Sequence, residues 1–241
     1  MKKQLLSCLT ISMLLLIIGA CSQTKQVSGS SNYITKDIRV GSFSKIKSMS
    51  SSDIVYTQKQ VTPTVQIYGP DNIVQLLETT VEGKTLVVKF KKNSSIRNSG
   101  KLEIRVSSPS LNHLSIYGSG NTTFTNGMES NDDLEICIYG SGNINGTNFS
   151  CTKLSTHIYG SGNINLKKID VPCTEANISG SGNVLLNGKS GKAEYRIAGS
   201  GDINAVDLKT EDVNAHISGS GSIKCHATEN LTGGVSGSGS V

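Results

Sequence analysis

One tripeptide, Gly-Ser-Gly, recurs at nearly regular intervals through the second half of this 241-residue chain. Its seven copies are separated by 22, 20, 20, 19, 20 and 18 residues. They begin at Gly118, Gly140, Gly160, Gly180, Gly199, Gly219 and Gly237. A fixed period in this range indicates a repeat architecture, in which each copy is a small structural unit that buries its apolar face against its neighbours.

Apolar residues alternate with polar ones on both sides of each tripeptide. Two residues before the first glycine stand Ile116, Ile138, Ile158, Ile178, Ile197, Ile217 and Val235. Four residues after it stand Ile144, Ile164, Val184, Ile203, Ile223 and Val241. Alternation with a period of two is typical of half-buried strands rather than helices. Each copy is therefore predicted to be two short strands hinged at Gly-Ser-Gly.

The length of the repeat selects the fold class. A coil of about 20 residues, at about 3.3 Å per residue, has a contour of roughly 66 Å, which closes one rung with two or three short sides. A propeller blade needs about twice as many residues. We therefore predict an all-β, right-handed parallel β-helix, or β-solenoid, with rungs of about 20 residues. Glycine suits the hinge because it accepts positive φ and allows coils to approach closely.

Two polar positions repeat beside the hinge and are expected to form columns, because identical offsets stack in successive rungs. Asn121, Asn143, Asn163 and Asn183 lie three residues after the first glycine and predict a structural ladder. Tyr117, Tyr139 and Tyr159 lie one residue before it and predict a tyrosine ladder on the outer face. The tyrosines either form a binding patch or simply stiffen the sheet, and the sequence leaves both readings open.

The N-terminus predicts export and lipid attachment. Lys2 and Lys3 precede a short apolar stretch, as in a secretory signal peptide over residues 1–20. Ile18-Gly19-Ala20-Cys21 resembles the bacterial lipobox, which implies cleavage before Cys21 and acyl chains such as palmitate on its sulfur; the alternative is an ordinary signal peptide with a chance cysteine. Ser22 resembles the sorting residue of outer-membrane lipoproteins. We expect a protein anchored in the bacterial cell envelope, at the outer membrane. The sequence does not decide whether the anchor lies in the inner or the outer leaflet of that membrane.

The segments between Cys21 and the repeats are less regular. Residues 21–36 are mostly polar and predict a flexible tether. Residues 37–241 predict the β-solenoid domain, with irregular rungs or a cap over 37–112 and regular repeats over 113–241. Strands are expected at Asp37–Val40, Ile54–Tyr56, Val65–Tyr68, Val74–Glu78, Thr85–Phe90 and Lys101–Val106. A small separate sandwich is the alternative to a cap, which we favour because no linker intervenes.

The repeat motif resembles that of a known family. The units Ile138–Ile144, Ile158–Ile164 and Ile178–Val184, together with Gly41-Ser42-Phe43 leading to Ile46 and to Asp53-Ile54-Val55, are similar to the head GIN domain family of auto-transporter adhesins. The resemblance covers about residues 37–241. It implies a right-handed β-helix on a secreted or lipid-anchored envelope protein, and it supplies no catalytic residues.

Composition and spacing weigh against several kinds of site. Without residues 1–20 the chain has 21 basic and 18 acidic residues, a charge of +3, and no basic stripe, so nucleic acid is not an expected partner. His113, His157 and His216 fall on outward offsets in different rungs and are expected to face solvent. His157 and His216 share one offset, but two copies of the repeat lie between them, which is too far for one metal, and we expect no metal and no cofactor. Cys225 has an inward offset, whereas Cys137 and Cys151 are either a disulfide or unpaired thiols.

The sequence predicts a general class of function rather than a specific ligand. We expect a non-catalytic binding module, an adhesin, with a protein or glycan ligand. Glu135, Glu175 and Glu194 share an outward offset, and they support the alternative of a polysaccharide-processing enzyme. A periplasmic scaffold or sensor partner is the third reading. The open rung at Val241 would allow pairing with a second copy or another chain.

Overall fold

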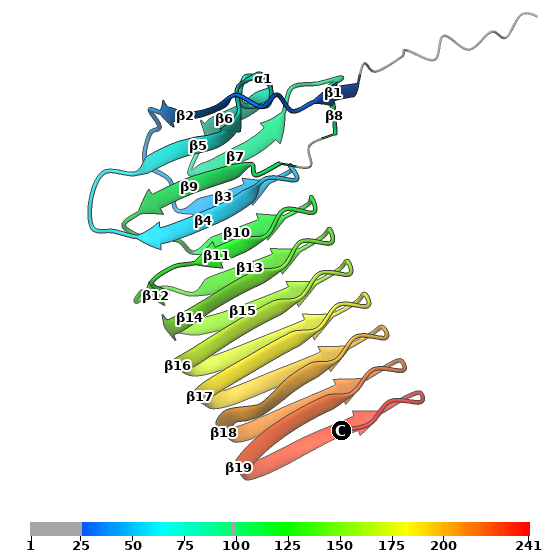
Figure 1. The fold of residues 1–241 in the computed structure, drawn as a ribbon. Helices are drawn as coiled ribbons and strands as arrows, with labels where there is room; N and C mark the ends of the chain where they lie inside the picture. The colour runs from blue at the N-terminus through cyan, green and yellow to red at the C-terminus, as the bar shows by residue number, and fades with distance from the viewer. Residues whose placement is uncertain (1–25, 98–99) are drawn as a thin grey trace, which may run out of the picture.

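The computed structural model describes residues 26–97 and 100–241, which form a β-solenoid of about six turns with rungs of about 20 residues. Figure 1 shows the rungs stacked along one axis, with the C-terminal strand at the end farthest from the N-terminal strands. Seventeen strands belong to one continuous hydrogen-bonded sheet, and β1 (Gln26–Ser28) and β8 (Ser95–Arg97) form a separate pair. The predicted all-β solenoid is confirmed.

Each rung has two arms, one before and one after Gly-Ser-Gly, and each arm pairs in parallel with the same arm of the next rung. From β16 onward a single long strand runs through the bend between an arm and the arm that follows it. The strands are β10 (His113–Ile116), β11 (Thr122–Phe124), β12 (Met128–Glu129), β13 (Leu134–Ile138), β14 (Ile144–Ser150), β15 (Lys153–Ile158), β16 (Ile164–Ile178), β17 (Val184–Ile197), β18 (Ile203–Ile217) and β19 (Ile223–Val235).

The apolar columns fill the space between the two arms. Ile138, Ile158 and Ile178 lie in register on successive rungs, and all three are buried. Near the N-terminal end the core is widened by aromatic rings: Phe124 makes edge contacts with Tyr56 and Phe149 at centroid distances of 5.5 and 5.4 Å. Burial of these columns against the next rung is what makes the array stable, since one rung alone has nothing to cover its apolar face.

The hinge glycines are required by close packing between rungs. Ser161 N donates to the carbonyl oxygen of Gly140 at 3.1 Å, and the same bond recurs from rung to rung. A Cβ on Gly160 or Gly162 would overlap the carbonyl oxygen of Gly140 or Gly142. Among the hinge glycines only Gly237 has a positive φ, of 139°. Of the two reasons for glycine that the sequence suggested, close approach accounts for all the other hinges.

The asparagines form a continuous ladder beside the hinge. The Nδ2 atoms of Asn143, Asn163 and Asn183 each donate to the Oδ1 atom of the preceding asparagine, at 2.9, 2.8 and 3.0 Å. These Oδ1 atoms, and that of Asn183, also accept from the backbone N–H of the next residue in the column, at 3.0–3.1 Å. At the N-terminal end, Asn121 donates to Asp53 Oδ1. The ladder thus connects rungs through side chains as well as backbone.

Residues 37–112 extend the stack and then close it. β3 (Lys45–Ser48) and β4 (Asp53–Gln58) pair in parallel with β10 and β11, and β7 (Thr85–Phe90) and β9 (Glu103–Ser108) pair in parallel with β3 and β4. The strands beyond them, β2 (Tyr33–Ile38), β5 (Thr64–Pro70) and β6 (Leu77–Glu82), are antiparallel to their partners. This change of direction covers the first apolar rung. A single helical turn, α1 (Asp71–Val74), precedes β6, where a strand over Val74–Glu78 was expected.

Part of the predicted tether is ordered structure packed on the cap, because residues 26–28 form β1 and residues 33–36 begin β2. β1 pairs with β8, and β2 pairs with β5. Ser30 Oγ and Asn32 Nδ2 donate to the carboxylate of Asp71 at 2.6 and 2.9 Å, and the rings of Tyr33 and Tyr68 lie 5.5 Å apart. These partners are about 40 residues away, so local composition does not reveal them.

The signal peptide over 1–20, Cys21 and residues 22–25 of the tether lie outside the described residues. Within residues 26–97 and 100–241, no helix has the length and apolar character needed to span a membrane.

Candidate functional site

The outer face of the arm that precedes Gly-Ser-Gly carries the polar and aromatic columns of the protein. Tyr117 and Tyr139 are stacked with centroids 4.4 Å apart and planes 7° apart. Tyr139 and Tyr159 are stacked at 4.8 Å and 10°. The three side chains are 43, 41 and 52 % exposed. We call this column the tyrosine ladder.

Stacking leaves only part of the ladder available to a ligand. Each internal ring face is covered by the next ring, and Lys47 Nζ lies 4.9 Å from the centroid of Tyr117 at the N-terminal end. The next residue in the column after Tyr159 is Ser179, whose small side chain does not cover a ring. The ladder therefore presents three hydroxyl edges and one open aromatic face, that of Tyr159.

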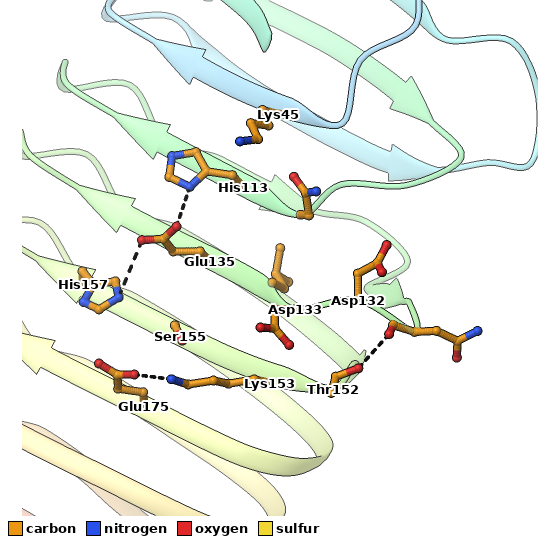
Figure 2. A pocket seen from close by; sticks show the side chains of 13 residues that line it. Lys45, His113, Asp132, Asp133, Glu135, Thr152, Lys153, Ser155, His157 and Glu175 are labelled. Atoms are coloured by element: carbon orange, nitrogen blue, oxygen red, sulfur yellow. Dashed lines mark hydrogen bonds and ion pairs between the residues drawn. The ribbon is translucent and has the colours of Figure 1, made fainter. Parts of the chain in front are cut away.

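Two further columns, three and five residues before each tripeptide, lie on the same face as the ladder. β10, β13 and β15 align His113 with Glu135, Glu135 with Ser155, and Ser115 with Cys137 and then His157. His113 Nδ1 is 2.9 Å from Glu135 Oε2, and His157 Nε2 is 3.8 Å from Glu135 Oε1. Figure 2 shows both imidazoles directed toward the one carboxylate.

His113, Glu135 and His157 line an open groove of about 760 Å³. Its lining is polar and carries both signs of charge, which suits hydroxyl-rich or mixed-charge ligands. The lining residues are Lys45, Asn112, His113, Asn131, Asp132, Asp133, Leu134, Glu135, Thr152, Lys153, Ser155, His157 and Glu175.

Glu135, Glu175 and Glu194, the glutamates that suggested a polysaccharide-processing enzyme, each make hydrogen bonds to different side chains. Glu175 accepts from Lys153 Nζ at 2.6 Å and from Asn177 Nδ2 at 2.5 Å, and Glu194 accepts from Arg196 Nε at 2.8 Å. Glu175 and Glu194 are neighbours in register. Glu135 lies two rungs from Glu175, with Ser155 between them.

The electrostatics of Glu135 and Glu175 do not suit a general acid. Burial alone raises the pKa of Glu135, but the hydrogen bond and charge of His113 outweigh it and the net pKa is lowered. Burial likewise raises the pKa of Glu175, and hydrogen bonds from Lys153 and Asn177 reverse the shift. A glycosidase acid needs a raised pKa to hold its proton at neutral pH. The geometry therefore disfavours the hydrolase reading.

The cysteines do not form the disulfide suggested by the sequence. Cys137 and Cys151 are both free thiols. Cys151 belongs to the apolar core, whereas Cys137 lies on the outward side of β13, with its Sγ 3.6 Å from Glu135 Oε1. Because the two side chains are on opposite faces of the sheet wall, their sulfurs cannot meet without moving the backbone. Burial and the Glu135 carboxylate raise the pKa of Cys137 to about 12.

The structure brings together potential metal ligands that sequence reasoning missed. The donor atoms of His113, Glu135 and Cys137 lie within 4.8 Å of one another. His216, at the same offset as His157, is three rungs further along and takes no part. The sequence does carry a signal for this cluster, because His113 and Glu135 both stand five residues before a Gly-Ser-Gly and so lie side by side on adjacent rungs. An alignment of histidines with histidines alone does not detect it.

Comparison with known proteins agrees with this architecture. Residues 42–241 match the family model described as "Putative auto-transporter adhesin, head GIN domain". The chain belongs to this family. Among curated proteins, none matches the sequence significantly.

Several solved structures share the fold. A "putative adhesin" from Bacteroides fragilis NCTC 9343 is 30% identical, with a TM-score of 0.78 over 89% of this chain and 98% of the other. A "putative lipid binding protein" from Parabacteroides distasonis ATCC 8503 is 26% identical, with a TM-score of 0.78 over 90% and 99%. A "putative adhesin" from Parabacteroides merdae ATCC 43184, at 24% identity and a TM-score of 0.78 over 90% and 99%, shows the fold alone.

Proposed function

We propose that this chain is a non-catalytic binding module of the bacterial cell envelope, an adhesin anchored by lipid on Cys21, that binds glycans along the outer face described above. The family description and the 30% identical "putative adhesin" from Bacteroides fragilis support the adhesin class. The lowered pKa values of Glu135 and Glu175 support a non-catalytic role.

The observation that carries the proposal is the exposed tyrosine ladder with its open end at Tyr159. A sugar ring presents an apolar face that packs on an aromatic ring, and it presents hydroxyls to neighbouring polar groups. Tyr159 offers the first kind of contact, and the ladder hydroxyls and the polar groove offer the second. The stacked rungs keep this surface rigid, so little ordering entropy is lost on binding.

The matched pair Tyr159→Ser and Tyr117→Ser tests the patch. Both variants remove one tyrosine from an end of the ladder, but Tyr117 is covered by Tyr139 and Lys47. We expect Tyr159→Ser to weaken binding to glycan arrays and to cells by roughly 10-fold, which is about 1.4 kcal/mol, and Tyr117→Ser to have a smaller effect. Substituting all three tyrosines should abolish binding. If the triple variant is folded and binds normally, the ladder is not the binding patch.

The anchor and the exposed leaflet need separate experiments. Cys21→Ser should release the protein from the membrane fraction and prevent incorporation of a labelled palmitate analogue. Protease digestion of intact and permeabilised cells then locates the domain. Cleavage on intact cells is the expected result for an adhesin. Protection until permeabilisation would rule out the adhesin role and favour a periplasmic scaffold or sensor partner.

A further inference from the structure

Four metal-ligating side chains meet on the outer face, and they come from three adjacent rungs. His113 lies on β10, Glu135 and Cys137 lie on β13, and His157 lies on β15. The register pairs His113 with Glu135, and Cys137 with His157. The solenoid thus places the four groups at the corners of a small patch, although they span 45 residues of sequence.

The distances between these groups are close to those of a loaded site. The closest approaches to the Glu135 carboxylate are 2.9 Å for His113 Nδ1, 3.6 Å for Cys137 Sγ and 3.8 Å for His157 Nε2. A tetrahedral ion with bonds of about 2.0–2.3 Å separates its ligand atoms by roughly 3.3–3.8 Å. Small rotations of the side chains would therefore suffice for His113, Glu135 and Cys137, whose donor atoms lie within 4.8 Å of one another, to reach one ion. His157 lies outside that group, and its imidazole would have to turn further to become the fourth ligand.

The environment of Cys137 also indicates that a cation binds here. Its side chain is 2 % exposed although its offset faces outward, because the surrounding side chains cover it. Its sulfur is in contact with a carboxylate, which disfavours the thiolate unless a cation lies between them. A buried thiol beside a carboxylate and an imidazole is an unusual choice for an outward-facing column, and a bound ion would explain it.

The ligand chemistry selects the ion. We propose that Cys137, His113, His157 and Glu135 form a Zn²⁺ site on the outer face of the solenoid. Sulfur and imidazole nitrogen exclude Ca²⁺ and Mg²⁺, which require oxygen ligands. With His157 turned in as the fourth protein ligand, the site is closed and structural rather than catalytic. The ion would clamp three rungs together beside the tyrosine ladder, because its ligands come from β10, β13 and β15.

Two other features of the groove affect the affinity. Lys45 is paired in register with His113 on the far side of the patch, and its ammonium group opposes a cation there. Lys153 is bound by Glu175 at 2.6 Å, so its charge is already compensated. Lys45→Gln should therefore tighten Zn²⁺ binding several-fold by removing the uncompensated charge.

The test is a Zn²⁺ titration of the full chain, purified in detergent, against a competing chromophoric chelator. We expect one Zn²⁺ per chain, and binding weakened at least about 100-fold by Cys137→Ser or His113→Asn. Cys173→Ser and His216→Asn are the matched controls, since they remove the same residue types elsewhere on the solenoid and should leave the affinity unchanged. Co²⁺ in place of Zn²⁺ should give thiolate charge-transfer absorption that Cys137→Ser removes.

The denaturation midpoint provides a second readout. It should rise with Zn²⁺ in the unsubstituted chain and in the control variants, but not in Cys137→Ser, which also shows whether that variant is folded. Absence of saturable binding to the folded chain would overturn the proposal. Binding that survives Cys137→Ser with the same affinity and Co²⁺ spectrum would overturn it equally.

Discussion

The packing of the hinge glycines predicts a large loss of stability from a single added methyl group. In Gly162→Ala the new Cβ would overlap the carbonyl oxygen of Gly142, well inside the 3.0 Å below which real Cβ atoms are essentially never found. It would also approach Ile138 Cγ2 to 3.0 Å. Neither neighbour is a flexible side-chain end, because one is backbone and the other is in the packed core. The two rungs must therefore move apart locally.

The cost follows from the hydrogen bonds at this point of contact. Three of them cross between the rungs next to Gly162: Ser161 N to Gly140 O at 3.1 Å, and Asn163 N and Nδ2 to Asn143 Oδ1 at 3.1 and 2.8 Å. At about 1 kcal/mol each, their loss destabilises by about 3 kcal/mol. The lower entropy of an unfolded chain with alanine offsets up to about 1 kcal/mol of this. We expect the free energy of unfolding to fall by about 2–3 kcal/mol.

Guanidinium denaturation followed by circular dichroism measures the effect. With an m-value of about 4 kcal/mol/M, the midpoint should fall by roughly 0.6 M. The matched control is Gly41→Ala, because a Cβ at Gly41 meets no atom within 4 Å. That variant should be unchanged or slightly more stable. If the two variants unfold at the same denaturant concentration, contact between rungs is not the reason for glycine at the hinge.

Three further perturbations test other parts of the structure. Phe149→Ala removes a buried ring that packs on Phe124 and should destabilise the protein by about 3–5 kcal/mol in the same denaturation assay. Asn143→Ala should cost about 2 kcal/mol by interrupting the ladder, whereas Asn143→Asp keeps the acceptor for the next rung and should cost less; equal losses would contradict the ladder's role. Hydrogen bonds from Ser30, and then from Asn32, lower the pKa of Asp71 below its ordinary value of 3.8. The stabilisation that the ionised carboxylate provides is therefore complete above pH 3.8, and it is lost as the pH falls through the lower pKa of the folded state. Asp71→Asn should therefore make residues 26–38 more sensitive to protease at neutral pH, and the same sensitivity should arise in the unsubstituted protein only in acid.

The repeats were predictable because the same interaction recurs in every rung. The isoleucines two residues before each tripeptide were expected in the core from alternation alone, and Ile138, Ile158 and Ile178 are buried there. The tyrosine stacking followed from identical offsets, without knowledge of the bend between the arms. In a solenoid, register is nearly fixed by the period, so a position in sequence translates directly into a position on the surface.

The unpredicted features depend on contacts between distant or dissimilar residues. The segment from β1 to β2 is held by hydrogen bonds to Asp71 and Asn72, about 40 residues further along the chain. The single turn of α1 has no apolar periodicity that could distinguish it from a loop. The cluster around Glu135 combines a histidine, a glutamate and a cysteine from two neighbouring columns. A search for one residue type repeated along one column therefore does not find it.

The asparagine ladder gives the solenoid a direction. Every amide oxygen accepts from the following rung and every amide nitrogen donates to the preceding one, so the side-chain dipoles align head to tail from the carboxylate of Asp53. Reversing one amide would set oxygen against oxygen on one side and nitrogen against nitrogen on the other, so the orientations are fixed collectively. Asp202 accepts from Ser222 N–H, but its side chain has no amide group to donate to Asn183. The chain of hydrogen bonds between side-chain amides therefore ends at Asn183, and beyond it the column continues only through backbone N–H donors.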